Sequence, residues 1–198
     1  MTRRLPELLA NLQRCRDLVG LGQRLKVMTN SLVDPSDIYR AALSQAISSL
    51  DHYVHSVVLD RGVEILMGRL PPASPSRVGP LSQASVAAIL SEHSSTREMA
   101  VRAHLVLTLT KETFQSGDDI ARAVASVGVN RIWATAFGAG ARDITIQLGL
   151  IVGRRNRIVH QCDTDPLNPG VPVPLTDVDA LQAVDFVELV GAGIDPFM

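Results

Sequence analysis

Hydrophobic residues recur every three or four positions along most of the chain, which is the spacing of one face of an α-helix. The pattern is clearest after the helix-start signal Asp34-Pro35-Ser36-Asp37, where it continues to about Leu66 or Met67. An earlier helix is predicted over residues 6–28, with Pro6 in its first turn, where a missing N–H costs nothing. Further helices are predicted over residues 83–92, 95–115, 118–127, 130–137 and 141–162.

Prolines mark the interruptions between these helices. One group lies between Pro71 and Pro80, and a second forms a Pro-rich loop over residues 163–175. After it, Thr176 and Asp179 form a pattern like a capping box and predict a C-terminal helix over 176–193. No strand pair is predicted. The pattern indicates an all-α bundle with long antiparallel helices, one domain over 1–198, with residues 1–30 as an N-terminal helical extension.

Composition narrows the class of protein. Of the 198 residues 46% are hydrophobic but only 4% aromatic, which favours packed helices of Leu, Val, Ile and Ala. No apolar run approaches the roughly 20 residues of a membrane helix, and no apolar signal core follows the N-terminus. The two cysteines, Cys15 and Cys162, have no metal-ligand spacing. We therefore expect a cytoplasmic protein with no membrane partner.

The charge balance excludes a protein that coats nucleic acid nonspecifically, because the formal net charge is only −1. A local basic patch is nevertheless present in Gly153-Arg154-Arg155-Asn156-Arg157-Ile158-Val159-His160. Arg155 and His160 lie about 140° apart around a helix, whereas Asn156 and His160 share a face. An Arg side chain is long enough for both groups to reach one cleft.

Cleavage of RNA needs groups of these kinds. A base takes the proton of the 2′-hydroxyl, an acid protonates the leaving 5′-oxygen, and a cation stabilises the charge on the phosphate. Histidine titrates near neutrality, and arginine presents a charged fork to two phosphate oxygens. This chemistry needs no metal or cofactor, so none is expected.

Residues 153–163 resemble the Arg-Asn-x-Ile-Val-His signature of HEPN-domain ribonucleases, late on a helix as in that family. Leu50-Asp51-His52-Tyr53-Val54-His55 looks like the Leu-Asp-x-Tyr-x-His pattern of a subgroup called RiboL-PSP-HEPN. The resemblance covers a quarter to a third of the chain. It implies a HEPN-like helical bundle that dimerises, which brings two Arg/His sets into one composite cleft.

The resemblance also implies roles for individual residues. Arg155 would bind the scissile phosphate and His160 would transfer protons, with Asn156 as a supporting polar group. Asp51 and His55 would support the site from the facing helix. We expect Arg154 and Arg157, which flank the motif, to hold the RNA backbone.

The implied function is a metal-independent endoribonuclease acting as a toxin or antiviral-defence effector. A lone nuclease of this kind would endanger its host, so a restraining antitoxin or a defence-system partner is expected. Some family members carry a modified Tyr two positions after the His. Cys162 stands there in this chain, which puts that mode of control in doubt.

Three other interpretations stay open. The basic segment is also consistent with an exposed helix end at which His160 caps carbonyl groups. A HEPN-like helical dimer without catalysis would bind nucleotide, RNA or protein. Residues 118–131 resemble a helix-turn-helix unit of a DNA-binding regulator. The following residues, 132–137, are too apolar for a recognition helix, and Trp133 and Phe137 look like core or interface anchors.

Overall fold

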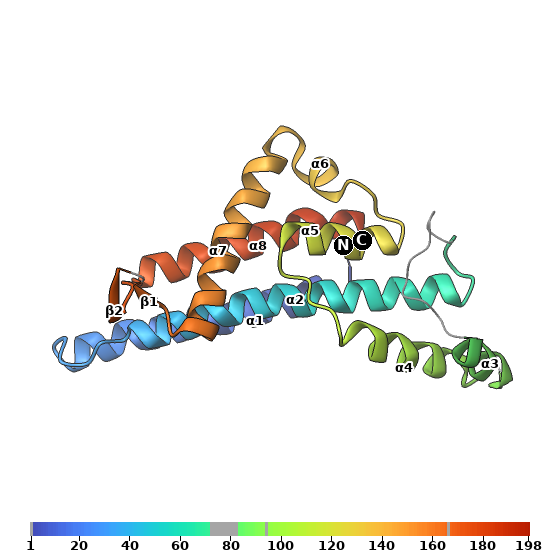
Figure 1. Cartoon of the computed structure of the whole chain (residues 1–198), viewed down its shortest axis with the longest axis horizontal. Coiled ribbons are helices and arrows are strands. Elements are labelled where there is room, and N and C mark those ends of the chain that lie inside the picture. Colours follow the sequence, from blue (N-terminus) through green and yellow to red (C-terminus); the bar gives the residue numbers. More distant parts are fainter. Residues whose placement is uncertain (1, 72–82, 94, 166) are drawn as a thin grey trace.

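A computed structural model describes residues 2–71, 83–93, 95–165 and 167–198 (Figure 1). The fold is all-α, with one small hairpin in addition. The α-helices are α1 (Leu5–Met28), α2 (Ser36–Leu66), α3 (Gln83–Ser91), α4 (Arg97–Leu109), α5 (Gly117–Ser126), α6 (Ile132–Phe137), α7 (Ala141–Gln161) and α8 (Asp177–Ile194). Short 3₁₀ turns, η1 (Gly138–Gly140) and η2 (Asp195–Phe197), follow α6 and α8. Strands β1 (Thr164–Asp165) and β2 (Asn168–Pro172) pair antiparallel.

Three long helices, α1, α2 and α8, pack lengthwise and enclose most of the hydrophobic core (Figure 1). Each contributes fully buried aliphatic side chains, for example Leu12 from α1, Ile47 from α2 and Val187 from α8. Because one face of each helix is apolar, burying the three faces together is the main source of stability.

A glycine sets the spacing between α1 and α8. A Cβ atom at Gly191 would clash with the side chain of Leu8, so α8 approaches α1 this closely only because that position lacks a side chain.

The remaining helices attach to this layer at two places. Helices α3 and α4 lie at the C-terminal end of α2, whereas α7 crosses α2 steeply near the other end (Figure 1). Helices α5 and α6 connect α4 to α7. The crossing places the last turns of α7 beside the hairpin and the start of α8, and this is the region that holds the Arg-rich segment.

Most predicted helix boundaries agree with the structure within a few residues, and the capping box of Thr176 and Asp179 is present. Three expectations differ. The helix predicted over 95–115 ends at Leu109, a β-hairpin forms where no strand pair was predicted, and the N-terminal helix is part of the core rather than an extension. The predicted proline loop at Pro72, Pro75 and Pro80 lies outside the described residues.

The early end of α4 has a tertiary cause. The side chain of His55 contacts the carbonyl oxygen of Leu109, and that of Asp51 accepts a bond from the backbone N–H of Phe114. These contacts satisfy backbone groups that another helical turn would otherwise use.

None of the helices in the described part of the chain is long and apolar enough to cross a membrane.

Candidate functional site

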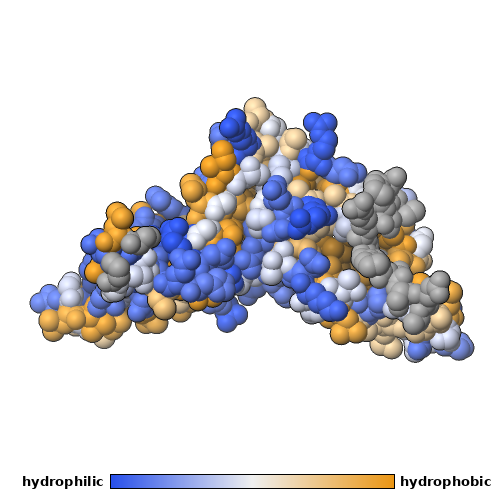
Figure 2. Space-filling view, in the orientation of Figure 1, coloured by the Kyte–Doolittle hydropathy of each residue, from blue (hydrophilic) through white to orange (hydrophobic). Residues whose placement is uncertain are grey.

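Helix α7 carries the Arg-rich segment and is only lightly buried. Leu148 and Val152 are its buried residues, because the helix crosses α2 instead of lying along it. Its outer face exposes Ile146 and Leu150, at 52% and 70% of their full surfaces. Figure 2 shows this hydrophobic surface over α7 next to the hydrophilic surface of the basic end.

Arg154 belongs to a buried ionic cluster. Its Nη2 atom donates to Oδ2 of Asp163 at 2.6 Å and to the carbonyl oxygens of Val173 and Pro174. Arg40 of α2 donates to the same carboxylate oxygen through Nε at 3.0 Å and to the carbonyl oxygen of Val173 through Nη2. Asp163 is fully buried, so two guanidinium groups compensate one carboxylate that water does not reach.

This cluster also ends the helix. Cys162 and Asp163 both have a left-handed backbone, with φ of 52°, and the N–H of Asp163 donates to the carbonyl oxygen of Arg157. A non-glycine residue rarely adopts this conformation, and asparagine and aspartate tolerate it best. The two ion pairs therefore fix the point at which the chain leaves α7 and enters the hairpin.

Arg154 thus has a structural role that its place in the basic segment does not predict. We had expected it to hold RNA backbone; its charge is instead largely used by Asp163. The roles of Arg40 and Asp163 were likewise not predicted from the sequence. A signal for Arg40 was present, since it lies among the apolar positions Tyr39, Ala42 and Leu43 on the buried face of α2.

Arg155 is half-buried and close to Asn156. Its Nη1 donates to Oδ1 of Asn156 at 3.1 Å, and it forms no ion pair with any residue that the structure describes. Its Nε atom is buried without a hydrogen-bond partner in the described chain. Arg155, the first residue of the expected catalytic pair, is therefore bonded to the supporting amide of Asn156, and its positive charge is not compensated by an acidic group of the described chain.

His160 and Arg157 lie on the opposite side of α7 from Arg155. Arg157 is half-buried and His160 is exposed, and neither side chain forms a hydrogen bond or an ion pair within the described residues. The capping role considered for His160 is therefore not seen. A single chain displays the Arg155 and His160 groups on different sides of one helix, in agreement with their spacing.

Asp51 and His55 do not join this group. They lie on α2 about 16 and 22 Å along the helix axis from Arg40, at 1.5 Å per residue, and contact the α4–α5 connection. The expectation that they support Arg155 and His160 within one chain does not match this placement. In the fold, Asp51 and His55 bind the end of α4 and the segment that follows it.

The two side chains influence each other's pKa. Burial would raise the pKa of Asp51, but hydrogen bonds with His55, the Phe114 N–H and Gln115 lower it overall. Burial would lower the pKa of His55, but its bonds to Asp51 raise it overall. Nδ1 of His55 lies 2.9 Å from the carbonyl oxygen of Asp51, and Nε2 lies 3.1 Å from that of Leu109. Two acceptors on one ring favour the doubly protonated imidazolium.

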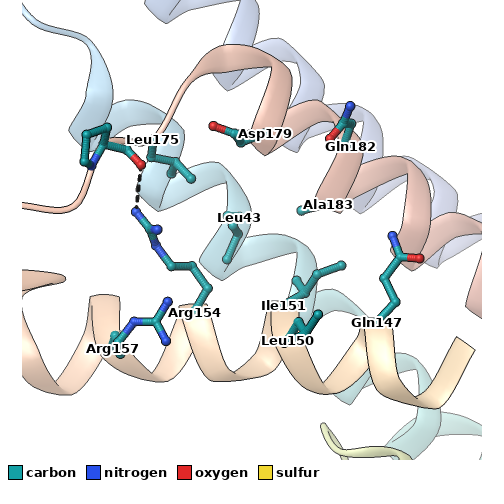
Figure 3. Close-up of a pocket in the computed structure, with 11 residues that line it drawn as sticks. Leu43, Gln147, Leu150, Ile151, Arg154, Arg157, Leu175, Asp179, Gln182 and Ala183 are labelled. Atoms are coloured by element: carbon teal, nitrogen blue, oxygen red, sulfur yellow. Dashed lines mark hydrogen bonds between the residues drawn. The ribbon is translucent and has the colours of Figure 1, made fainter. Parts of the chain in front are cut away.

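A pocket of about 420 Å³ opens beside the basic segment, between α7, α8 and α2 (Figure 3). Arg154 and Arg157 lie at one end and Gln147 and Gln182 at the other. The apolar side chains Leu43 and Ile151 lie between them, and Leu175 lies beside Arg154. This volume is within the range of small-molecule sites.

The helix-turn-helix interpretation loses support from the packing of α6. Ile132 is fully buried, Trp133 donates from Nε1 to the carbonyl oxygen of Gly117, and Phe137 packs against Gly193 of α8. Trp133 and Phe137 are thus anchors on the core, as predicted. The exposed residues of α6, Ala134 and Thr135, are small and uncharged, so this helix offers a DNA groove little to bind with.

Metal-ligating residues do not gather anywhere in the described ranges: no group of three His, Cys, Asp or Glu side chains is close enough to hold an ion. Both cysteines are free, Cys15 buried in the core and Cys162 exposed at the end of α7.

Comparisons with protein-family models, with curated proteins and with solved structures find no significant match for this chain.

Proposed function

We propose that the protein is a metal-independent endoribonuclease in which Arg155 binds the scissile phosphate and His160 transfers protons. The observation that carries the proposal is the contrast between adjacent residues of α7. Arg154 is compensated by a buried carboxylate, whereas Arg155, Arg157 and His160 have no acidic partner in the described chain. Structural arginines of this protein are paired, for example Arg16 with Asp185 and Arg102 with Asp60. Unpaired cations beside an exposed histidine suit a phosphodiester.

The proposed reaction needs no group outside these side chains. The 2′-oxygen attacks phosphorus as a base takes its proton, the bond to the 5′-oxygen breaks, and an acid protonates that oxygen. The products are a 2′,3′-cyclic phosphate and a 5′-hydroxyl end. The guanidinium of Arg155 offsets the negative charge that grows on the phosphate oxygens.

The proposal includes a homodimer. One chain holds Arg155 and His160 on different sides of α7, and the reaction needs both a base and an acid. Two copies that pair along α7 would supply two histidines and two arginines to one cleft. The exposed apolar residues Ile146 and Leu150, four positions apart on one side of this helix, are consistent with such pairing. Ile146→Glu should then dissociate the dimer in sedimentation experiments and abolish cleavage.

The cellular role follows from the proposed chemistry and from the motif resemblance, and it is part of the proposal. A ribonuclease of this kind acts as a toxin or antiviral-defence effector, restrained by an antitoxin or a defence-system protein. Expression of the wild type alone should arrest growth, and His160→Ala should relieve the arrest.

The direct test is RNA cleavage with chelator present. Wild-type protein, His160→Ala and the control His93→Ala are incubated with total RNA, and the new ends are analysed. His93 is a suitable control because it is exposed and its side chain forms no hydrogen bond with the described residues. We expect 2′,3′-cyclic phosphate ends from the wild type and His93→Ala only.

A second pair of variants tests the arginine. Arg155→Ala should lose cleavage, and Arg142→Ala, which changes an exposed and unpaired arginine at the start of the same helix, should retain it. If the wild type does not cut RNA at concentrations where it is dimeric, or if His160→Ala cuts equally, the ribonuclease proposal is wrong. RNA binding without cleavage would instead support the non-catalytic helical dimer.

A further inference from the structure

The pocket between α2, α7 and α8 is lined in part by α7, the helix that carries His160. Arg157 lines one end of it and precedes His160 by three residues, which is about 4.5 Å along the helix axis. Arg157 therefore lies about one helical turn along α7 from the proposed catalytic histidine.

The cationic end suits one phosphate group. Nη2 of Arg154 is held by Asp163 and by two carbonyl oxygens, so that side chain is fixed and largely compensated. Arg157 has no such partner in the described part of the molecule, and its guanidinium is available to an anion. Figure 3 shows the two side chains together at the same end of the pocket.

The other end suits the edge of a base. Gln147 from α7 and Gln182 from α8 lie across the pocket from the arginines (Figure 3). Neither amide bonds to another described residue, so each offers both donors and acceptors. The apolar side chains of Leu43 and Ile151 lie between the two ends, where a planar ring would be covered, and Leu175 lies beside Arg154.

Asp179 adds an acceptor in the middle of the wall. Its Oδ2 atom already accepts bonds from the N–H and hydroxyl of Thr176 in the capping box, so the carboxylate is fixed in position. Its Oδ1 atom accepts no bond from the described residues. A fixed carboxylate oxygen of this kind is how proteins bind the hydroxyl groups of ribose.

We propose that this pocket binds one ribonucleotide, with the phosphate on Arg157, the ribose hydroxyl on Asp179 and the base against Gln147 and Gln182. This inference rests on the proposed function, since it takes the bound nucleotide to be part of the RNA strand beside the cleaved bond. The pocket then selects which base lies there, and Gln147 and Gln182 determine the specificity. A free nucleoside monophosphate has the same chemistry and is the natural probe.

The test is titration calorimetry on the full-length His160→Ala protein, which should not cut RNA. The probes are AMP, GMP, CMP and UMP, the corresponding nucleosides, inorganic phosphate, and short single-stranded RNA and DNA of one sequence. We expect one monophosphate to bind saturably at one site per chain. The nucleoside and phosphate alone should bind at least roughly tenfold more weakly, and RNA should bind better than DNA.

Variants locate the site. Arg157→Gln should weaken binding of the monophosphate roughly 10- to 100-fold, the loss expected for a charge-assisted hydrogen bond. Gln147→Leu and Gln182→Leu should change the ranking of the four bases. Arg142→Gln is the matched control and should bind as before, with urea unfolding used to show that every variant folds.

The outcomes separate this inference from the ribonuclease proposal. Binding by His160→Ala without cleavage by the wild type would support the pocket and overturn the ribonuclease. Cleavage by the wild type with no nucleotide binding, and an unchanged cleavage pattern in Gln147→Leu and Gln182→Leu, would overturn the pocket alone. Equal loss of binding in Arg157→Gln and Arg142→Gln would also overturn it.

Discussion

Nη2 of Arg154 donates to Oδ2 of Asp163 across 2.6 Å, and this ion pair holds the start of the β-hairpin against the last turns of α7. Arg40 of α2 shares the same carboxylate oxygen. The pair therefore determines where the basic segment ends and how it faces α2. It also separates the arginines of the segment into one that maintains the fold and two that remain free for a ligand.

We expect Asp163→Asn to lower the free energy of unfolding by about 3–5 kcal/mol, because it leaves two poorly solvated guanidinium groups without their counter-charge. Urea-induced unfolding followed by circular dichroism measures the change. Asp143→Asn is the control, since Asp143 is exposed and unpaired in the described chain and should change stability by no more than about 0.5 kcal/mol. Equal stability of the two variants would show that the buried ion pair contributes nothing.

The contact of His55 with Asp51 predicts a pH dependence of stability. Because the pKa of His55 is raised in the folded protein, its contribution is fully present below the pKa of the unfolded chain, about 6.5. It is lost as the pH rises through the folded pKa. The free energy of unfolding should therefore decrease as the pH rises above about 6.5, and His55→Gln should flatten this part of the profile.

The control for that experiment is His93→Gln, which changes an exposed histidine and should keep the slope of the wild type. A slope that survives in His55→Gln would assign the pH dependence to other groups.

The ion pairs of Asp60 predict that stability changes with pH in the opposite direction, at low pH. Burial would raise the pKa of Asp60, but hydrogen bonds from Arg4, Arg3 and Arg102 lower it to about 2. The contribution of this carboxylate is present above the unfolded pKa near 3.9 and is lost as the pH falls through about 2. Asp60→Asn should therefore destabilise the protein by about 1–3 kcal/mol at pH 7 and by much less at pH 2.

Unfolding in urea at pH 7, 4, 3 and 2 measures this difference. Glu112→Gln, at an exposed residue without a partner in the described structure, is the control and should show little difference at any pH. A constant penalty for Asp60→Asn down to pH 2 would contradict the ion-pair explanation.

The sequence predicted the helices because their causes are local. The start of α2 follows from Asp34-Pro35-Ser36-Asp37, and the start of α8 follows from the capping box at Thr176. It did not predict the end of α4, because Asp51 and His55 act there from more than 50 residues away.

The candidate site was predicted only in part, because only some of its contacts are between residues that are close in the sequence. The motif identified Arg155, Asn156, Arg157 and His160 as one basic segment, and α7 displays them near its end. It did not predict that Arg154 pairs with Asp163, because that carboxylate is buried only through its contact with Arg40 of α2, 123 positions away. The pocket was not foreseen, because Gln147 on α7 and Gln182 on α8 meet only through the crossing of these helices.

The close packing of Phe137 against Gly193 predicts that α6 is held tightly on α8. A Cβ atom at this position would lie 2.6 Å from Cε1 of Phe137, nearer than such atoms approach each other. Phe137 stacks on Trp133 at 6.0 Å between ring centroids, so it has little room to move. Gly193→Ala should thus destabilise the protein by about 1–3 kcal/mol and change the fluorescence of Trp133.

The matched control is Gly20→Ala in α1, where a Cβ atom meets nothing within 4 Å. There the substitution should stabilise the helix by about 0.5–1 kcal/mol, because alanine loses less backbone entropy than glycine on folding. Opposite signs for the two variants would show that the loss at Gly193 comes from the contact with Phe137. If Gly193→Ala is as stable as Gly20→Ala, α6 is not held against α8 and would be free to enter a DNA groove.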